Sequence, residues 1–190
     1  MPNALISRRA LLRSAGSATV GTLLLDALPS LAQAPTPRAG GGEFAFLTGE
    51  WRIANRYHRR RPDGSYFWDE FPGEATVRAV LAGNGSIEEL RIPARNFGGL
   101  GIRLYDAERR AWKDSWVDGT QRVVGEPTYG NFENGVGTWI ADDPNDGHPI
   151  KSRGIWDRIT PTSCRWYSSI SRDAGATWED VWYMAWTRVS

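Results

Sequence analysis

From residue 44 onward, apolar and polar residues alternate in short runs that predict β-strands almost throughout. The runs are rich in β-branched and aromatic residues, and turn signals such as Asp63-Gly64 and Asn134-Gly135 separate them. Asn134-Gly135 is the strongest of these signals, because a two-residue type I′ turn needs positive φ at both positions. No segment after residue 43 shows a helical period with caps. The pattern predicts an all-β domain of about nine or ten antiparallel strands, connected mostly as hairpins.

The ten tryptophans, all after residue 50, follow the faces of these expected strands. Asp114 stands between Trp112 and Trp116 on one face. The last strand carries two sets of side chains: one face shows Trp178, Asp180, Trp182, Met184, Trp186 and Arg188, and the other shows Glu179, Val181, Tyr183, Ala185 and Thr187. Because successive strand residues point to opposite faces, one set is inside. We expect the tryptophan-rich face to be the interior.

The N-terminal 34 residues are typical of a twin-arginine signal peptide. A twin-arginine pattern, Ser7 to Arg13, precedes an apolar stretch that ends at Ala32-Gln33-Ala34. Cleavage is expected after Ala34, or after Ala32 because Pro35 hinders signal peptidase. The apolar stretch is too short and interrupted to span a bilayer core of about 30 Å. The expected product is a folded periplasmic protein without a stable membrane anchor.

The remaining chain divides into a Pro/Gly linker, 35–43, and one domain, 44–190. Removing the three Arg and one Asp of the signal from the 23 basic and 22 acidic residues leaves 20 and 21. Since no basic bias survives, nucleic acid is not an expected partner. A lone cysteine, Cys164, cannot form an intramolecular disulfide and is interpreted as a half-buried small hydrophobe. The sequence leaves open whether the protein forms a homodimer.

Residues 171–178, SRDAGATW, have the S-x-D-x-G-x-T-W frame and resemble the Asp-box that sialidases and other propeller proteins repeat on successive blades. One copy cannot build a propeller, and the chain shows no repeat of blade length. We therefore interpret Asp173 as part of a turn, in which its side chain bonds local backbone.

The segment from Phe44 to Trp51 reads F-x-F-L-x-G-x-W and resembles the opening of lipocalins and related calycin barrels, while the last strand closes with Trp186-Thr187-Arg188. Other segments are similar to a bacterial domain-of-unknown-function family of calycin-like barrels: Leu104–Asp106 with Trp112 and Trp116, Gly130–Gly137, Asp146–Ile150, Trp156–Pro161 and Thr177–Glu179. The resemblance implies an up-and-down barrel of about 8–10 strands. It also implies a structural cation–π contact between Trp51 and Arg188 at the closed end.

The resemblance carries over no substrate and no cofactor. Related haem-binding barrels use a histidine near the C-terminal strands, and residues 149–190 contain none. Metal binding is not expected either, since His58 and His148 are far apart and no cluster has ligand spacing.

Carboxylates on tryptophan faces are the candidate chemistry. Asp114 and Asp180 would be buried beside aromatic rings, which raises a carboxyl pKa unless a cation pairs with it. Arg153 shares one face with Asp157 and could supply that cation. Two interpretations stay open: an internal network that fixes the barrel, or an acid/base or ligand-anchoring pair.

Two further sets of polar residues are candidates for the cavity. Asp69-Glu70, with Tyr66, Phe67 and Trp68, is interpreted as a loop over the mouth of the barrel, either a lid or a rim. Arg91, Asn96 and Tyr105 could reach the cavity, depending on the register.

The resulting hypothesis is a protein that binds a small, partly apolar, aromatic or cyclic molecule inside the barrel. The expected ligand-binding residues are Trp112, Trp116, Arg153, Asp157, Trp166, Trp182 and Trp186. An enzyme, such as an isomerase, cyclase or hydrolase using a buried Asp with Arg or Tyr, is one alternative. A filled barrel that acts as a structural or interaction protein is the other.

Overall fold

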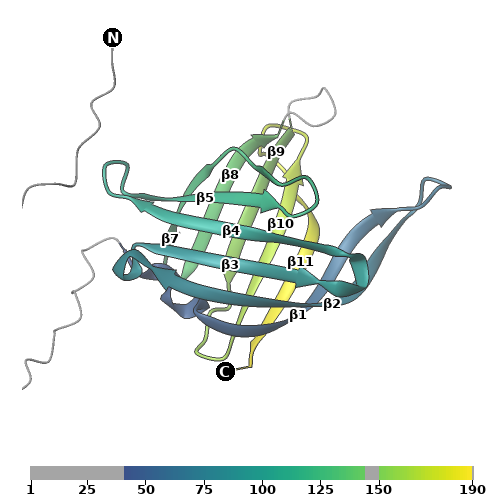
Figure 1. Cartoon of the computed structure of the whole chain (residues 1–190). Coiled ribbons are helices and arrows are strands. Elements are labelled where there is room, and N and C mark those ends of the chain that lie inside the picture. Colours follow the sequence, from purple (N-terminus) through teal and green to yellow (C-terminus); the bar gives the residue numbers. More distant parts are fainter. Residues whose placement is uncertain (1–40, 144–149, 190) are drawn as a thin grey trace, which may run out of the picture. The chain divides into compact units, whose positions relative to one another are not determined.

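The computed structural model describes residues 41–143 and 150–189, which form a closed antiparallel β-barrel (Figure 1). The expected signal peptide, most of the linker, and His148 lie outside the described residues. The strands are β1 (Gly49–Arg60), β2 (Tyr66–Val80), β3 (Gly85–Ile92), β4 (Phe97–Asp106), β5 (Ala111–Asp118), β6 (Val123–Val124), β7 (Thr128–Glu133), β8 (Val136–Asp143), β9 (Ile150–Asp157), β10 (Ser163–Ser171) and β11 (Glu179–Arg188).

Ten of these strands make the barrel wall in up-and-down order, each paired with its neighbours in sequence. Strand β5 pairs with both β4 and β7, and the short β6 adds only to the end of β5. The barrel closes where β1 pairs with β11, with Trp51 opposite Arg188. The all-β prediction and its strand number are confirmed.

The described residues contain three short 3-10 segments and no α-helix: η1 (Glu43–Leu47), η2 (Leu81–Gly83) and η3 (Pro93–Arg95). Within this part of the chain, no helix has the length and apolar character needed to cross a membrane. The predicted turn at Asn134-Gly135 has positive φ at both residues, 50° and 79°. The strongest turn signal of the sequence is thus confirmed.

One end of the barrel is covered by η1, whose Phe44 and Leu47 are buried in the core. The Trp51 indole N–H donates to the Leu47 carbonyl oxygen at 2.7 Å. The Arg188 guanidinium lies over the Trp51 ring, 4.2 Å from its centroid, and donates to the carbonyl oxygens of Phe46 and Pro161. This geometry is consistent with the calycin-like arrangement that the resemblance implied.

Tryptophan rings fill much of the interior, and glycines on adjacent strands make room for them. Five tryptophans belong to the buried core cluster, and Trp116, Trp166 and Trp182 are partly buried and pack against it. In the register, Trp112 faces Gly130, Trp116 faces Gly101, and Trp139 lies between Gly130 and Gly154. A Cβ on Gly130 would lie 2.6 Å from the Trp139 ring. Glycine therefore lets a large flat ring lie against the neighbouring backbone.

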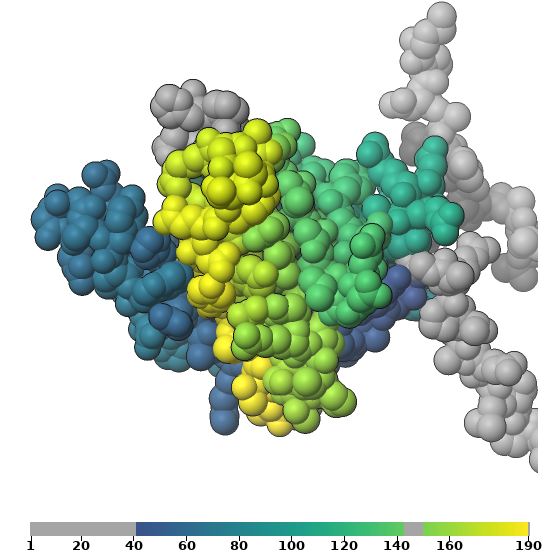
Figure 2. Space-filling view, turned by 180° about the vertical axis from the view of Figure 1, so that it is seen from behind, coloured from purple at the N-terminus to yellow at the C-terminus, as the bar shows by residue number. Residues whose placement is uncertain are grey.

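The first hairpin, β1–β2, projects beyond the barrel wall (Figures 1 and 2). The sequence predicted that Tyr66 to Glu70 form a loop over the mouth of the barrel. These residues instead lie in β2 and pair with Arg56 to Arg60 of β1. The turn itself is only a few residues long, because an Asx motif closes it: Asp63 Oδ1 accepts from the Ser65 N–H at 2.9 Å. The prediction of a loop over the mouth, whether as a lid or as a rim, is therefore wrong.

Candidate functional site

A cavity of about 420 Å³ lies inside the barrel. Its apolar wall comes from strands on both sides of the barrel and includes Leu90, Phe97, Trp116, Trp139, Trp156, Trp166, Trp182, Met184 and Trp186. The indoles pack on one another: Trp166 meets Trp182 edge to face with centroids 5.6 Å apart, and Trp156 is tilted against Trp186 at 5.4 Å. Such packing holds each ring in one place, so the wall is preorganised.

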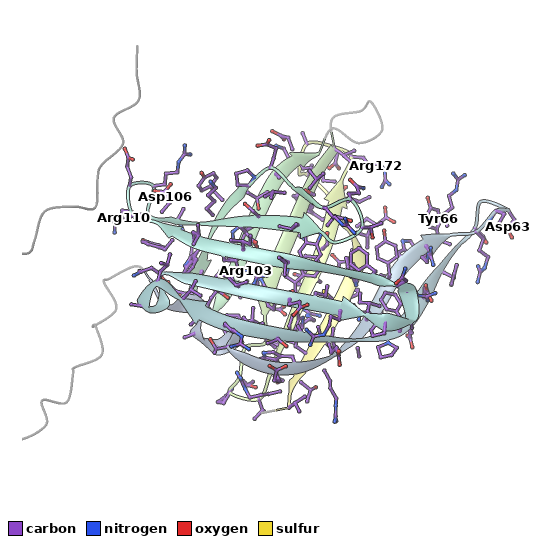
Figure 3. All side chains as sticks on the ribbon, in the orientation of Figure 1. Asp63, Tyr66, Arg103, Asp106, Arg110 and Arg172 are labelled. Atoms are coloured by element: carbon purple, nitrogen blue, oxygen red, sulfur yellow. The ribbon has the colours of Figure 1, made fainter. Side chains whose placement is uncertain are left out.

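A buried polar cluster, Glu88, Arg103 and Asp114, forms one side of this cavity. Arg103 Nη2 donates to Glu88 Oε2 at 2.7 Å, and Arg103 Nε lies 3.4 Å from Asp114 Oδ2. The Arg103 side chain is 6% exposed and that of Glu88 is 4% exposed. Figure 3 labels Arg103 at the middle of the barrel wall, far from the labelled residues of the projecting hairpin.

Burial raises the pKa of both carboxyls in this cluster, and the Arg103 charge offsets part of that effect. The nearby carboxylates raise the pKa of Arg103, which stays charged. One guanidinium thus faces two carboxyls, and the cluster is electrically neutral when one of the two carries a proton.

Three buried N–H donors on residues that line the cavity lack an acceptor among the described residues: Arg103 Nη1, Trp156 Nε1 and Trp186 Nε1. The indole N–H groups of two other cavity residues are hydrogen-bonded. Trp139 Nε1 donates to the Trp112 carbonyl oxygen at 3.2 Å, and Trp182 Nε1 donates to Asn55 Oδ1 at 3.0 Å. Because buried donors are nearly always bonded, the unsatisfied ones need an explanation.

Six of the residues named from the sequence line the cavity: Asp114, Trp116, Arg153, Trp166, Trp182 and Trp186. Trp112 does not line it. Its ring is fully buried and packs against Phe44, with ring centroids 4.9 Å apart. Its indole N–H donates to Glu43 Oε2 at 3.1 Å.

Asp180 is on the outer face of β11, contrary to the expected alternation. Ser168 pairs with Trp182 and Ser169 with Asp180, so Val181 is the extra residue of a β-bulge, which reverses the facing of Asp180. Its carboxylate accepts from Ser169 Oγ at 2.6 Å and from the Tyr183 hydroxyl. The expectation that Asp180 lies in the cavity is therefore wrong.

Asp157 and Arg153 share a face, as expected, but it is the outer one. Asp157 alternates with the cavity residue Trp156 and accepts two hydrogen bonds from Arg165, at 2.8 and 2.5 Å. Arg153 borders the cavity, yet its guanidinium lies 4.2 Å over the Trp178 ring. Neither residue reaches the polar cluster.

The three residues that depended on the register, Arg91, Asn96 and Tyr105, lie outside the cavity. Arg91 forms outer-face ion pairs with Glu74 and Glu89, and Asn96 is an exposed residue with left-handed φ of 47° at the end of η3. Tyr105 packs against Trp112 at a centroid distance of 5.6 Å. None of the three lines the cavity.

The cavity residues that sequence reasoning missed include two charged ones, Glu88 and Arg103, and two tryptophans, Trp139 and Trp156. A signal for Glu88 exists, since it shares the inner face of β3 with Leu90 and Ile92, which are buried. No comparable signal marks Arg103, which occupies an inner position between glycines and Tyr105 on β4. The two tryptophans follow from the alternation once the register is known.

Three other residues that the sequence singled out, Asp173, Cys164 and His58, do not line the cavity. Asp173 Oδ1 accepts from the Thr177 N–H at 2.8 Å and Oδ2 from the Thr177 hydroxyl at 2.6 Å, which lower the pKa of Asp173 to about 2. Burial raises the pKa of the Cys164 thiol to about 12. His58 stacks on Tyr66 and Trp68, with Nδ1 3.3 Å from Glu179 Oε1. Within the described ranges, no group of three His, Cys, Asp or Glu side chains could hold a metal ion.

These features define the class of the molecule: a closed ten-stranded antiparallel barrel, with a cavity walled by tryptophan and a buried Glu–Arg–Asp cluster. No family model matches the chain, and no curated protein compared with it matches either. The structure supports a calycin-like fold without assigning a family.

Proposed function

We propose that the protein binds a small, partly apolar, aromatic or cyclic molecule in the interior of its barrel. The observation that carries this proposal is the cavity of about 420 Å³ with six indoles in its wall. An eight-to-ten-stranded barrel has room for side chains or one small ligand. Here the space lies within the range of about 300–1,000 Å³ that is typical of small-molecule sites. This volume favours binding over a filled barrel.

Tryptophan fluorescence tests the proposal directly. A panel of planar aromatic and cyclic probes is titrated into the protein, and one or more is expected to quench the emission saturably with a stoichiometry near one. Trp166→Phe, in the cavity wall, should reduce the quenching. Trp68→Phe is the matched control, because Trp68 lies outside the core cluster and stacks on His58. Absence of saturable quenching by every probe would contradict binding.

An enzyme on the same scaffold is the second candidate. The observation that favours it is the position of Asp114, whose pKa is raised by burial, at the wall of an aromatic cavity beside Arg103. In that case Asp114→Asn abolishes turnover of a cavity ligand while the melting temperature stays nearly unchanged. If ligand binds and is recovered chemically unchanged, the protein is a binder.

The finer family assignment and the location are parts of the same proposal. Support for a calycin-type protein is the Arg188 guanidinium over the Trp51 ring next to the closing strand pair. Support for a periplasmic protein exported by the twin-arginine route is the Arg8-Arg9 pattern. Changing both arginines to lysine should leave the protein in the cytoplasm in a fractionation experiment.

A further inference from the structure

Resting on the proposed function, we infer that the ligand is an organic cation, which places its positive charge beside the Asp114 carboxylate and its apolar body against the indoles. The ligand class is thus an aromatic or cyclic amine, or a quaternary ammonium compound. Such a ligand brings a positive charge into a cavity whose acids outnumber its available bases.

The first support is that a ligand can reach Asp114. This residue lines the cavity and its side chain is 24% exposed, whereas the Glu88 side chain is 4% exposed and the Arg103 side chain is 6% exposed. Arg103 Nε lies 3.4 Å from Asp114 Oδ2, which is a longer contact than the 2.7 Å between Arg103 and Glu88. The two oxygens of a carboxylate accept about four hydrogen bonds, so Asp114 keeps acceptor capacity for a ligand.

The second support is the balance of charge around the cavity. Glu88 and Asp114 share one guanidinium, that of Arg103, and Glu126, an exposed acid, also lines the cavity. The other basic residue of the lining, Arg153, holds its guanidinium 4.2 Å over an indole that is outside this lining. A ligand anion would add to the excess of acid, and an uncompensated charge in this environment is costly. A ligand cation offsets the excess.

A bound cation also replaces a proton. Burial raises the pKa of Asp114 and of Glu88, and the Arg103 charge offsets part of that effect. The ionisable side chains that share the cavity lining with Asp114 are Glu88 of β3, Arg103 of β4, Arg153 of β9 and Glu126, which precedes β7. A positive charge beside Asp114 favours its ionised form. Binding should therefore release a proton wherever Asp114 is protonated in the free protein.

The third support is the aromatic wall. Trp166 and Trp182 are partly buried, and their ring planes meet at 88°, so they form two sides of a corner in the lining. Trp116 follows Asp114 by two residues on β5, which places the two side chains on one face, about 7 Å apart along the strand. Indole rings attract cations, and more strongly when the cation is desolvated. The same rings pack well against a flat apolar body.

Three probes of one shape test the inference by isothermal titration calorimetry at pH 7. They are 4-(hydroxymethyl)-N,N,N-trimethylanilinium, 4-tert-butylbenzyl alcohol, in which carbon replaces the charged nitrogen, and 4-(hydroxymethyl)benzenesulfonate. The cation is expected to bind about tenfold or more tightly than the neutral alcohol, because a desolvated cation gains this much from indole rings. The sulfonate should bind most weakly of the three.

Three variants localise the effect. Asp114→Asn removes the accessible charge, and the preference for the cation over the alcohol should fall about tenfold. Asp142→Asn is the matched control: it is the same substitution at a side chain that is 86% exposed and pairs with Lys151, so solvent screens its charge and the preference should not change. Glu126→Gln, at an exposed position, should lower the preference about twofold and replaces Asp114→Asn if that variant does not fold.

Proton release is a second readout. The quaternary cation does not titrate, so any change of its affinity with pH comes from the protein. Its affinity should increase between pH 4 and pH 8 for the native chain, and less steeply for Asp114→Asn. Calorimetry in two buffers that differ in ionisation enthalpy should show release of protons on binding, and less release for Asp114→Asn.

The outcomes separate the inference from the proposed function. If neither these probes nor the aromatic panel binds, the ligand-binding proposal fails and the inference fails with it. If the panel binds but the cation does not, or the alcohol binds at least as tightly as the cation, or the sulfonate binds best, the cation inference is overturned while ligand binding stands. A cation preference that is unchanged in both Asp114→Asn and Glu126→Gln also overturns it.

Discussion

Gly130→Ala should destabilise the barrel strongly, because the new methyl group has no space. On the ideal geometry its carbon would lie 2.2 Å from the Thr138 carbonyl oxygen and 2.6 Å from the Trp139 ring. The first atom is backbone of the adjacent strand β8. The ring cannot retreat easily either, since Phe44 and Phe132 each pack on it at a centroid distance of 5.5 Å.

The expected cost follows from the overlap. Both neighbours must move by about 1 Å or more to reach ordinary contact, and overpacking of this kind costs about 1–3 kcal/mol, occasionally more. We expect about 3 kcal/mol for Gly130→Ala, since a backbone atom is involved. For a domain of this size, that loss lowers the melting temperature by roughly 6–12 °C.

Gly154→Ala is the matched control, also a strand glycine beside a tryptophan. Its new carbon would lie 3.3 Å from Trp166 Nε1 and no closer to any other atom. The small crowding is offset by the reduced freedom of the unfolded chain, so stability should change by about 0.5 kcal/mol or less. Urea unfolding followed by tryptophan fluorescence measures both variants. Equal stability of the two variants would refute the role assigned to glycine.

Three further changes test other parts of the structure. Arg188→Met removes the guanidinium that bonds three carbonyl oxygens at the closed end, and should cost about 2 kcal/mol in urea unfolding, whereas Arg188→Lys should recover part of it. The pKa of Asp173 is lowered to about 2, so its contribution to stability is present above the ordinary carboxyl pKa and is lost as the pH falls toward 2. In Asp173→Asn, the melting temperature should therefore fall less steeply between pH 4 and 2. For Asp114 the pKa is raised, so the folded state binds the proton more tightly than the unfolded chain and stability falls as the pH rises; Asp114→Asn should fall less steeply, and an unchanged slope would contradict the burial of this group.

Much of the barrel could be predicted from the sequence, because alternation and turn chemistry are local. Asn134-Gly135 specifies its turn through backbone conformation alone. The first hairpin shows where this fails: Tyr66 to Glu70 contain charges and aromatic residues without clean alternation, since both faces of the projecting strands are partly exposed. A strand outside the barrel wall has no buried face to mark it.

The site was predicted only in part, for two physical reasons. Alternation gave the correct inner face for Trp182 and Trp186, but a single extra residue, Val181, reversed the facing of Asp180. A bulge of this kind has no local sequence signal. Arg103 and Glu88 were not predicted as cavity residues because the burial of each depends on the other. A buried charge is tolerated only when an opposite charge, here on the neighbouring strand, pairs with it.

The closing strand pair ties the first strand of the wall to the last, since Arg188 contacts Thr48, 140 residues earlier in the chain. A nascent chain that stops before β11 would therefore have two unprotected sheet edges, one at each end of an open ribbon. Open edges of this kind invite pairing with other chains and attack by proteases. The barrel can therefore close only after β11, its last strand, has been synthesised.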